Sequence, residues 1–213
     1  MQIARPALAA AAASLLWVAG SGSGAASAPL SPVIQKLISL DDRVHSFTAD
    51  VQAGVVMHSF PYLTTELGGI YYHKQPSKDR IVFTSGVPFI ARAFSTVYPH
   101  VESPSRWSDV YDISIERDEG GFTTFRLVPR SREHVNHIDA KIADATGELA
   151  QLRWNYAGGG YATLNQTYGK VGSYRLVTRE SGHYEDSNYN ADLSSTFSNF
   201  KLNVAIPDSV FSQ

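Results

Sequence analysis

The chain has 213 residues, of which 43% are hydrophobic, and it carries 18 Lys and Arg against 20 Asp and Glu, a net charge of −2. This length suits one ordinary domain, and the slight acidic excess gives no support for nucleic acid or an anionic membrane surface as a partner. The absence of cysteine excludes disulfides, cysteine-based catalysis and thiolate metal sites.

Residues 1–28 have the layout of a secretory signal peptide. One positive charge, Arg5, precedes an apolar run over residues 7–19, and a small-residue A-x-A cleavage site ends at Ala28. The alternative is a buried or membrane-spanning helix, but the run is short for a span and glycines come directly after it. The sequence therefore predicts cleavage near Ala28 and one mature domain over residues 29–213. No cysteine stands at the cleavage site, so a lipoprotein-type anchor is not expected.

A helix is expected at the start of the mature domain, in the stretch SPVIQKLISLDDRVHS. Ser31 and Pro32 suit the N-cap and the first turn of a helix. The apolar side chains after them recur near helical spacing, so one face of the helix should pack on the rest of the domain. These apolar positions are Val33, Ile34, Leu37, Ile38 and Leu40.

A long strand is expected next, over residues 47–57. Its odd positions are Phe, Ala, Val, Ala, Val and Met, whereas its even positions are mostly polar. This two-residue period predicts one buried face and one solvated face. The strand is about twice the usual length, so its apolar face must cover an unusually long surface.

The whole sequence after Ser46, the long strand included, has the pattern of a meander of about ten or eleven strands joined by short turns. A two-residue period recurs in ELGGIYYHKQP, KDRIVFTSG, SYRLVTRESG, NYNADLSSTFSNF and KLNVAIP. Three hairpins are expected where glycine-containing turns interrupt the alternation. These turns lie at residues 119–121, 145–147 and 158–160.

One connection, over residues 86–109, is longer than the turns and is rich in proline and aromatic residues. It could hold a short helix near residues 88–97. A long apolar connection in a compact domain is usually functional or covers a core, and both interpretations stay open here.

The sequence offers no catalytic or metal-binding motif. His134 and His137 would point to opposite faces of a strand, and His183 lies in what has the pattern of a loop tip. Asp41 and Asp42 lie at the end of the first helical stretch and are expected to begin the turn into the long strand. No G-x-S-x-G or H-E-x-x-H motif occurs, and no helix follows the triple glycine as a phosphate-binding loop requires. We therefore expect no catalysis, no metal and no cofactor.

Paired apolar side chains recur along most of the predicted strands. A sheet with one long apolar face must stack on a second sheet or curl around something. A curled sheet with little internal cover leaves a cavity that can hold a small apolar ligand. The alternative is a fully packed β-sandwich or barrel, and periodicity does not separate the two. The pairs are Ile70 with Tyr72, Ile81 with Phe83, Ile113 with Ile115, Phe125 with Leu127, Ile138 with Ile142 and Leu152 with Trp154.

Several short motifs, taken in order, resemble the LolA-like family of periplasmic lipoprotein carriers and lipoprotein-sorting proteins. FTA at 47–49 is similar to an F-x-A strand start, and GIYYHKQP at 69–76 to a glycine-to-proline strand with alternating hydrophobic positions. FRLVP at 125–129 resembles a strand end with L-x-P, and DATGEL at 144–149 a D-x-x-G turn. The chain closes on IPDSVF, similar to I-P-D-x-x-F. Gln75 stands where true carriers often have a basic residue, so the broader sorting proteins match better.

The resemblance implies a mainly β (α+β) fold: a strongly curved, half-closed antiparallel β-sheet, an incomplete barrel, with short helices covering its concave apolar face. It also implies a soluble periplasmic carrier or binder of lipid or lipoprotein acyl chains, without catalysis and working with a membrane donor or acceptor protein. The alternative is an envelope sensor or scaffold that binds a protein partner through the sheet rim, and a third interpretation is a hydrolase of an envelope polymer.

Fourteen side chains are expected to line the cavity, and the alternative for each of them is ordinary core packing. They are Val51, Val55, Met57, Ile70, Tyr72, Ile81, Phe83, Phe89, Phe94, Ile113, Ile115, Leu127, Leu152 and Trp154.

Overall fold

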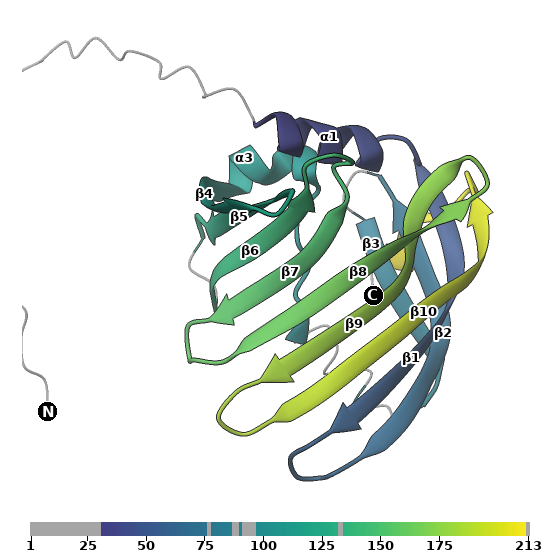
Figure 1. The fold of residues 1–213 in the computed structure, drawn as a ribbon. Coiled ribbons are helices and arrows are strands. Elements are labelled where there is room, and N and C mark those ends of the chain that lie inside the picture. Colours follow the sequence, from purple (N-terminus) through teal and green to yellow (C-terminus); the bar gives the residue numbers. More distant parts are fainter. Residues whose placement is uncertain (1–30, 76–77, 87–89, 91–96, 132–133, 212–213) are drawn as a thin grey trace, which may run out of the picture.

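The computed structural model describes residues 31–75, 78–86, 90, 97–131 and 134–211, whose arrangement Figure 1 shows. The predicted signal peptide lies outside the described residues, as does most of the helix expected in the long connection. The described elements are α1 (Pro32–Asp41), β1 (Ser46–Met57), β2 (Thr64–Lys74), β3 (Lys78–Ser85), η1 (Pro104–Arg106), α3 (Trp107–Val110), β4 (Tyr111–Glu119), β5 (Phe122–Pro129), β6 (Val135–Ala143), β7 (Leu149–Tyr156), β8 (Tyr161–Val171), β9 (Tyr174–Glu185), β10 (Asn190–Leu202) and η2 (Asp208–Phe211).

The described strands form one antiparallel sheet in the order β3-β2-β1-β10-β9-β8-β7-β6-β5-β4. Strands that are consecutive in sequence pair, except that β3 and β4 lie at opposite edges, and β1 pairs with β10. The sheet is therefore not closed into a barrel. The predicted mainly β fold is confirmed, and the three predicted hairpin turns separate β4 from β5, β6 from β7 and β7 from β8.

The prediction of a separate strand at KLNVAIP, residues 201–207, is wrong. β10 ends at Leu202, and Asn203 has a φ of 54°, a left-handed conformation that does not continue a strand. The backbone beyond it bonds to side chains instead of to a neighbouring strand: Lys74 Nζ donates to the carbonyl oxygen of Ile206 over 3.0 Å. This segment consequently crosses the sheet instead of extending it.

β1 has the two faces that its sequence predicts. Its odd positions are buried or half-buried, whereas Asp50 and Gln52 are exposed. We call the face that carries Val51 the inner face. Residues directly opposite each other on neighbouring strands share a face of the sheet, so the partners of Val51, Gly69 of β2 and Phe197 of β10, also belong to the inner face.

In β2, the residues that lie on the inner face are not the ones that the sequence predicted. Ile70 and Tyr72 pair with polar outer-face positions of β1, so these two predicted cavity residues lie on the outer face. Tyr71 and His73 occupy the inner face instead. The stretch is aromatic or apolar at odd and even positions alike, so alternation does not choose the face, and the register with β1 does.

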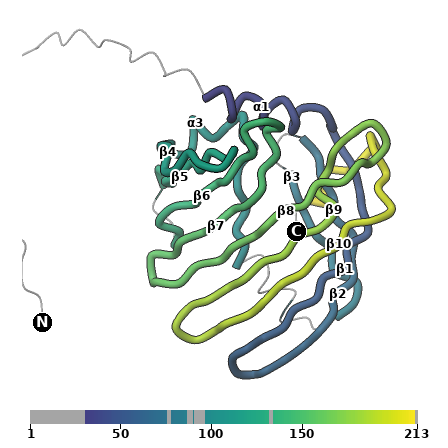
Figure 2. Tube along the Cα trace, in the orientation of Figure 1, coloured from purple at the N-terminus to yellow at the C-terminus, as the bar shows by residue number. Residues whose placement is uncertain are grey.

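The sheet curls, so that strands far apart in its order face each other. In Figures 1 and 2, β3 lies behind β8 and β9. The packing agrees with this view, because Phe83 of β3 and Leu164 of β8 adjoin the same hydrophobic cluster. Likewise Ile81 of β3 and Val177 of β9 adjoin a second cluster.

The inner face carries three hydrophobic clusters. The large cluster joins α1 and α3 to β4, β5, β6, β7 and β8. A second cluster contains Val55 of β1 and Leu67 of β2, and a third, which we call the Val51 cluster, contains Val51 and Phe197. The helices thus cover one half of the sheet, and the other half packs in smaller groups.

α1 lies across one end of the curled sheet (Figure 1). It begins as the sequence predicts, with the Ser31 side chain accepting a hydrogen bond from the first turn, and it buries Ile34 and Leu37 in the large cluster. The turn between β6 and β7 touches the helix at Gly147, whose φ is +76°. A Cβ at this glycine would lie 2.8 Å from the backbone carbonyl carbon of Lys36, so only glycine permits this approach.

The connection from β3 to β4 leads from one edge of the sheet to the other. Its described residues pack on the inner face: Ile90 and Trp107 are buried, and the ring of Tyr98 meets that of Trp154 edge-on at 5.5 Å. Gly182 of β9 makes room for Tyr98, since a Cβ there would lie 2.4 Å from the tyrosine Oη. Among the described helices, none is long and apolar enough to cross a membrane.

Candidate functional site

An inner pocket lies between the large cluster and the Val51 cluster. It consists of two adjoining cavities of about 340 and about 210 Å³, which share residues from α1, β2 and β8. Because α1 and the connection before α3 form part of its wall, the pocket lies beneath the segments that cover the sheet. The shared lining residues are Leu37, Asp41, Tyr71, His73, Gln166 and Tyr168.

Three of the predicted cavity residues line the inner pocket. Ile81 of β3 lies on one side, and Leu152 and Trp154 of β7 lie on the other. Leu164 of β8 and Phe197 of β10 add to the apolar wall. The curled sheet therefore brings together side chains from strands that its order places far apart.

The other predicted cavity residues lie elsewhere. Val51, Val55 and Leu127 are buried within the clusters, and Met57, Phe83 and Ile113 pack against them. Ile115 is 60% exposed on the edge strand β4, and Ile70 and Tyr72 are on the outer face. Phe89 and Phe94 lie outside the described residues.

A hydrogen-bonded group of polar side chains forms one wall of the pocket. His73 Nδ1 lies 2.8 Å from Asp79 Oδ1, and Tyr71 Oη donates to the same oxygen over 2.5 Å. Burial favours the neutral form of Asp79, but these hydrogen bonds outweigh it and hold its pKa below the ordinary value. The carboxylate in turn raises the pKa of His73 above its ordinary value, although burial opposes this.

Two further carboxyl groups face the pocket from α1 and β9. Burial raises the pKa of Asp41, although Ser103 Oγ donates a 2.9 Å hydrogen bond to its Oδ2. Burial also raises the pKa of Glu180, to about 7, against the opposing effect of a 3.0 Å hydrogen bond from Gln166 Nε2 to Oε1. The sequence pattern predicted that Asp41 begins a turn, whereas Asp41 is the last residue of α1, and no pattern distinguished Glu180.

Trp154 contributes an unused hydrogen-bond donor. Its side chain is 2% exposed and lines the pocket, and its Nε1 has no hydrogen-bond partner among the described residues. An indole nitrogen can only donate, and leaving a buried donor unpaired costs about 1–3 kcal/mol. This nitrogen is itself fully buried, so it faces protein atoms and not the open volume of the pocket.

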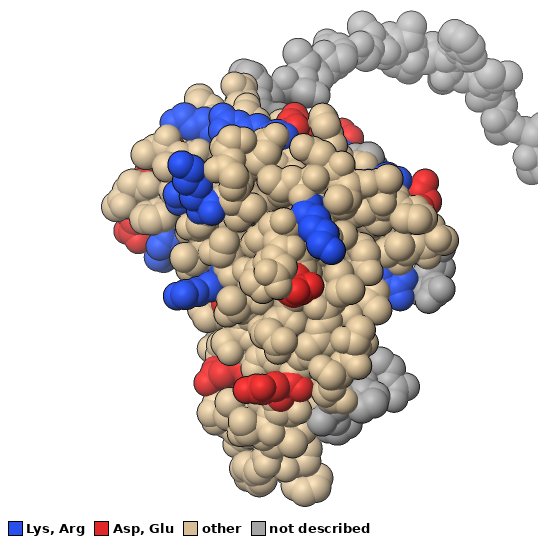
Figure 3. Space-filling view, turned by 90° about the vertical axis from the view of Figure 1, so that its right-hand side faces the viewer, with Lys and Arg blue, Asp and Glu red and all other residues tan. Residues whose placement is uncertain are grey.

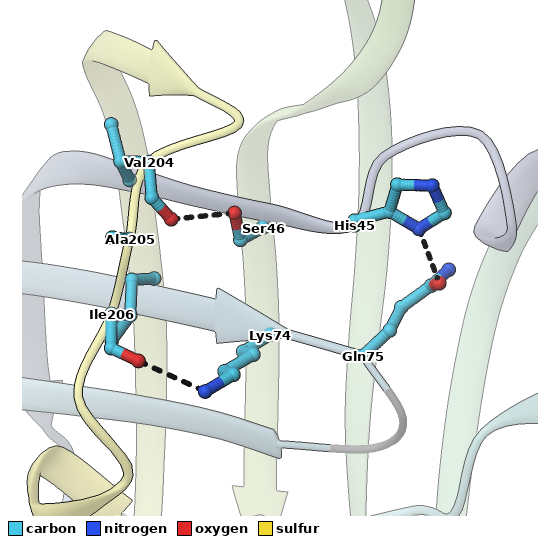
Figure 4. A pocket seen from close by; sticks show the side chains of 7 residues that line it. All are labelled: His45, Ser46, Lys74, Gln75, Val204, Ala205 and Ile206. Atoms are coloured by element: carbon cyan, nitrogen blue, oxygen red, sulfur yellow. Dashed lines mark hydrogen bonds between the residues drawn. The ribbon is translucent and has the colours of Figure 1, made fainter.

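A separate open pocket of about 540 Å³ lies where the C-terminal segment crosses the ends of β1 and β2 (Figure 4). Ser46 and Lys74 each donate a hydrogen bond to the backbone of that segment, and His45 bonds to the side chain of Gln75. The polar groups here hold the segment in place, so we assign this pocket a structural role.

Two histidines share the carboxylate of Asp192. His183 lies within β9, so its predicted place in a loop tip is wrong, and its Nδ1 is 2.7 Å from Asp192 Oδ1. His58 Nε2 lies 2.8 Å from Oδ2 of the same carboxylate. Within the described ranges, no group of three or more His, Asp or Glu side chains could hold a metal ion.

Three solved structures have this arrangement of elements. A LolA superfamily protein from Nitrosomonas europaea aligns with a TM-score of 0.54 at 11% identity, over 85% of this chain and 96% of its own. An outer membrane lipoprotein-sorting protein domain from Vibrio parahaemolyticus aligns with a TM-score of 0.61 at 9% identity, over 84% and 94%. A DUF1329 family protein from Desulfovibrio piger aligns with a TM-score of 0.56 at 11% identity, over 84% and 95%.

The fold is LolA-like. The alignments extend over nearly the whole of each solved chain, so the complete domain and not a fragment of it is shared. No protein-family model matches the sequence, and no curated protein does either. The LolA-like fold is thus shown by the structural alignments. The sequence identity is too low for functional residues of the solved structures to be assigned to positions of this chain.

Proposed function

We propose that this chain is a soluble periplasmic carrier or binder of lipid or of lipoprotein acyl chains, without catalysis and without a cofactor. The observation that carries the proposal is the inner pocket, which lies between two hydrophobic clusters beneath α1. The LolA-like fold supports it, because one structure with this fold is named as a lipoprotein-sorting protein domain. The signal-peptide layout of residues 1–28 supports export to the periplasm.

The energetics suit a carrier that must also release its cargo. Burying a chain of about fifteen methylene groups at ~0.8 kcal/mol each gives on the order of 12 kcal/mol. Association and ordering costs remove a large part of this, which leaves a moderate affinity. In this proposal α1 and the connection from β3 to β4 cover the concave apolar face, and their opening sets the rate of release.

The proposal is tested on the mature protein after lipid has been removed. We expect native mass spectrometry of protein isolated from the envelope to detect bound lipid. The delipidated protein should take up an uncharged fluorescent dye such as Nile red saturably, with a stoichiometry near one. Absence of both bound lipid and saturable uptake would contradict the proposal.

A pair of variants separates the inner pocket from other apolar surfaces. Leu164→Trp should fill the pocket and reduce dye uptake, since Leu164 is a half-buried wall residue that borders free volume. Val128→Trp is the matched control, because Val128 is 38% exposed and does not line the pocket. Equal uptake by the two variants, with both folded by circular dichroism, would place the binding site elsewhere.

A protein-binding scaffold is the second candidate, and exposed aromatic side chains favour it. Phe60 and Tyr62, at the tip of the β1–β2 hairpin, are 79% and 74% exposed, and Tyr189, in the neighbouring β9–β10 turn, is 48% exposed. The lower end of the molecule in Figure 3 shows neither basic nor acidic groups. Exposed aromatic groups of this kind are common at protein interfaces.

The two candidates differ in how partner binding responds to lipid. A partner that is captured equally by lipid-loaded and delipidated protein, and lost in a Phe60→Ser, Tyr62→Ser double variant, would favour the scaffold. Capture that depends on lipid loading would favour the carrier.

A further inference from the structure

The inner pocket carries more acidic groups than an oily cavity needs. Asp41 of α1 lines both adjoining cavities, Asp79 of β3 lines one of them together with Glu102, and Glu180 of β9 lines the other. Carboxyl groups from distant elements thus converge on the inner pocket. Burying carboxyl groups next to an apolar cavity is unfavourable unless they are paired. Their convergence inside the protein therefore needs an explanation that the binding of a plain hydrocarbon chain does not give.

The basic side chains that line the pocket leave Glu180 without a charged hydrogen-bond partner. They are His73, His100 and Arg175. His73 is bonded to Asp79 and also interacts with the charge of Asp41, and Arg175 is bonded to Glu148. His100 interacts with the charge of Asp79. Among the described residues, Glu180 is hydrogen-bonded to the neutral Gln166.

One carboxylate oxygen of the pocket wall has unused hydrogen-bonding capacity. Glu180 lines the pocket and uses Oε1 to accept from Gln166, and its Oε2 has no partner among the described residues. A carboxylate oxygen is an acceptor with negative charge, so the complementary ligand group is a cationic donor.

We propose that the inner pocket selects amphiphiles whose polar end carries a protonated amine, with the amine bound at Glu180. This inference rests on the proposed function, since the apolar wall of the pocket would hold the hydrocarbon chain. It adds the chemical class of the cargo, because a fatty carboxylate would meet like charges in the same space.

The pocket also makes this selection dependent on pH. Burial places the pKa of Glu180 at about 7, so its negative charge forms as the pH rises through neutrality. Asp79, held in its charged form, faces it from β3. His73 of β2 loses its positive charge as the pH rises, which also favours the binding of a cation. An amine keeps its own charge throughout, because alkyl amines resemble lysine with a pKa of about 10.4.

Other titratable groups around Glu180 do not reverse this dependence. Tyr71 of β2, Tyr98 of the connection and Tyr168 of β8 have pKa values raised by burial, so they stay neutral. Arg175, on the same strand as Glu180, stays positive. Burial also raises the pKa of Asp41 on α1, so Asp41, like Glu180, gains negative charge as the pH rises.

The experiment compares three ligands that share one hydrocarbon chain: dodecylamine, dodecanol and dodecanoate. Each competes with Nile red for delipidated mature protein, below its micellar concentration, at pH 8.0 and pH 5.5. We expect dodecylamine to bind about tenfold more tightly than dodecanol at pH 8.0, which is the scale of one charge-assisted hydrogen bond, and dodecanoate to bind most weakly. At pH 5.5 the advantage of the amine should shrink to about twofold or less.

A matched pair of variants identifies the group responsible. Glu180→Gln keeps the shape and removes the charge, so it should abolish the amine preference at pH 8.0 and bring the affinities for dodecylamine and dodecanol to within about twofold of each other. Glu185→Gln is the control on the same strand, at an exposed position outside the pocket, and should retain the preference.

The outcomes separate this inference from the proposed function. Binding of all three ligands with equal affinity at both pH values would overturn the amine selectivity and leave the lipid-binding proposal standing. Binding of none of them, together with no uptake of the dye, would overturn both. An amine preference that survives in Glu180→Gln would also overturn the assignment of Glu180.

Discussion

Glu180 should make the folded protein less stable as the pH rises. A carboxyl group whose folded pKa is raised contributes stability below its unfolded pKa of about 4.3, and this stability is lost as the pH rises through the folded value. The folded pKa of Glu180 is about 7 because the group is buried. We therefore predict that Glu180→Gln is more stable than the unmodified protein at pH 8 by on the order of 2 kcal/mol, and that this difference disappears near pH 4.

Urea unfolding of both proteins across this pH range measures the effect. The difference between the two curves isolates Glu180 from groups such as His73, whose raised pKa gives a loss of stability in the same direction. Glu185→Gln, on the exposed part of β9, should follow the unmodified protein. Parallel curves for all three proteins would show that Glu180 titrates as a solvated side chain.

Gly182 should be intolerant of any side chain. A Cβ there would lie 2.4 Å from Tyr98 Oη and 2.8 Å from the backbone oxygen of Thr163, and the backbone of β8 has little freedom to move. We predict that Gly182→Ala costs about 1–3 kcal/mol in the free energy of unfolding.

Gly158 provides the control for this substitution. A Cβ at Gly158, in an exposed turn, would meet nothing within 4 Å, so Gly158→Ala should change stability by less than about 0.5 kcal/mol. Chemical denaturation compares the two, and equal effects would mean that Tyr98 does not rest on β9 in solution.

Alternation of residue type predicted the faces of some strands and not of others. β1 alternates between apolar and polar, so burial of its odd positions followed from the sequence. In β2 the run from Ile70 to His73 offers ring or aliphatic groups to both faces, and only pairing with β1 decides between them. Asp79 and Glu180 are charged residues on strands, which a hydrophobic pattern places outside, so the polar wall of the pocket was not predictable.

The two parts of the sheet around β5 and around β3 differ in how tightly their side chains pack. Substitutions of core residues in each part should show this difference. Phe125 of β5 is 1% exposed in the large cluster, beneath α1 and α3. Phe83 of β3 is half-buried at the border of a smaller cluster. We predict that Phe125→Ala costs about 3–5 kcal/mol, as in closed cores, and that Phe83→Ala costs less, because its side chain is only half-buried.

Thermal and urea unfolding check both variants. The result that would contradict the expectation is a Phe83→Ala cost equal to that of Phe125→Ala. Phe83 would then be ordinary core, and the side of the sheet around β3 would be as tightly packed as the side around β5.

Turns were more predictable than the elements that depend on distant contacts. Gly120, Gly121 and Gly147 have positive φ values in the turns where the sequence placed them, because glycine is the residue for which that conformation carries no penalty. The end of β10 was not predictable, because the residues after Leu202 have a strand-like pattern but bond to side chains of β1 and β2.

At the scale of the whole molecule, the sequence predicted a meander and did not predict its central junction. β1 and β10, the first and last strands, pair with each other, so β3 and β4 become the edges. Nothing local specifies this pairing, because it joins residues such as Val51 and Phe197 that are far apart in the chain. This pairing has a functional consequence. The parts of the sheet on either side of the β1–β10 junction, which we call its two arms, face each other across the inner pocket. The pocket is bounded by Ile81 on one arm and by Leu152 on the other.

A ligand in this pocket should therefore stabilise both arms together. A ligand that binds only the folded state at one hundred times its Kd adds about 2.7 kcal/mol to stability, which for a domain of this size raises Tm by roughly 5–10 °C. We predict that saturating dodecylamine at pH 8.0 produces such a shift and slows amide hydrogen exchange in β3 and in β7 alike, since each supplies a wall of the pocket. Leu164→Trp, in which the pocket is filled, is the control and should show neither effect. Protection confined to the arm that contains β7 would mean that the ligand sits on one face of the sheet and that the two arms do not enclose it.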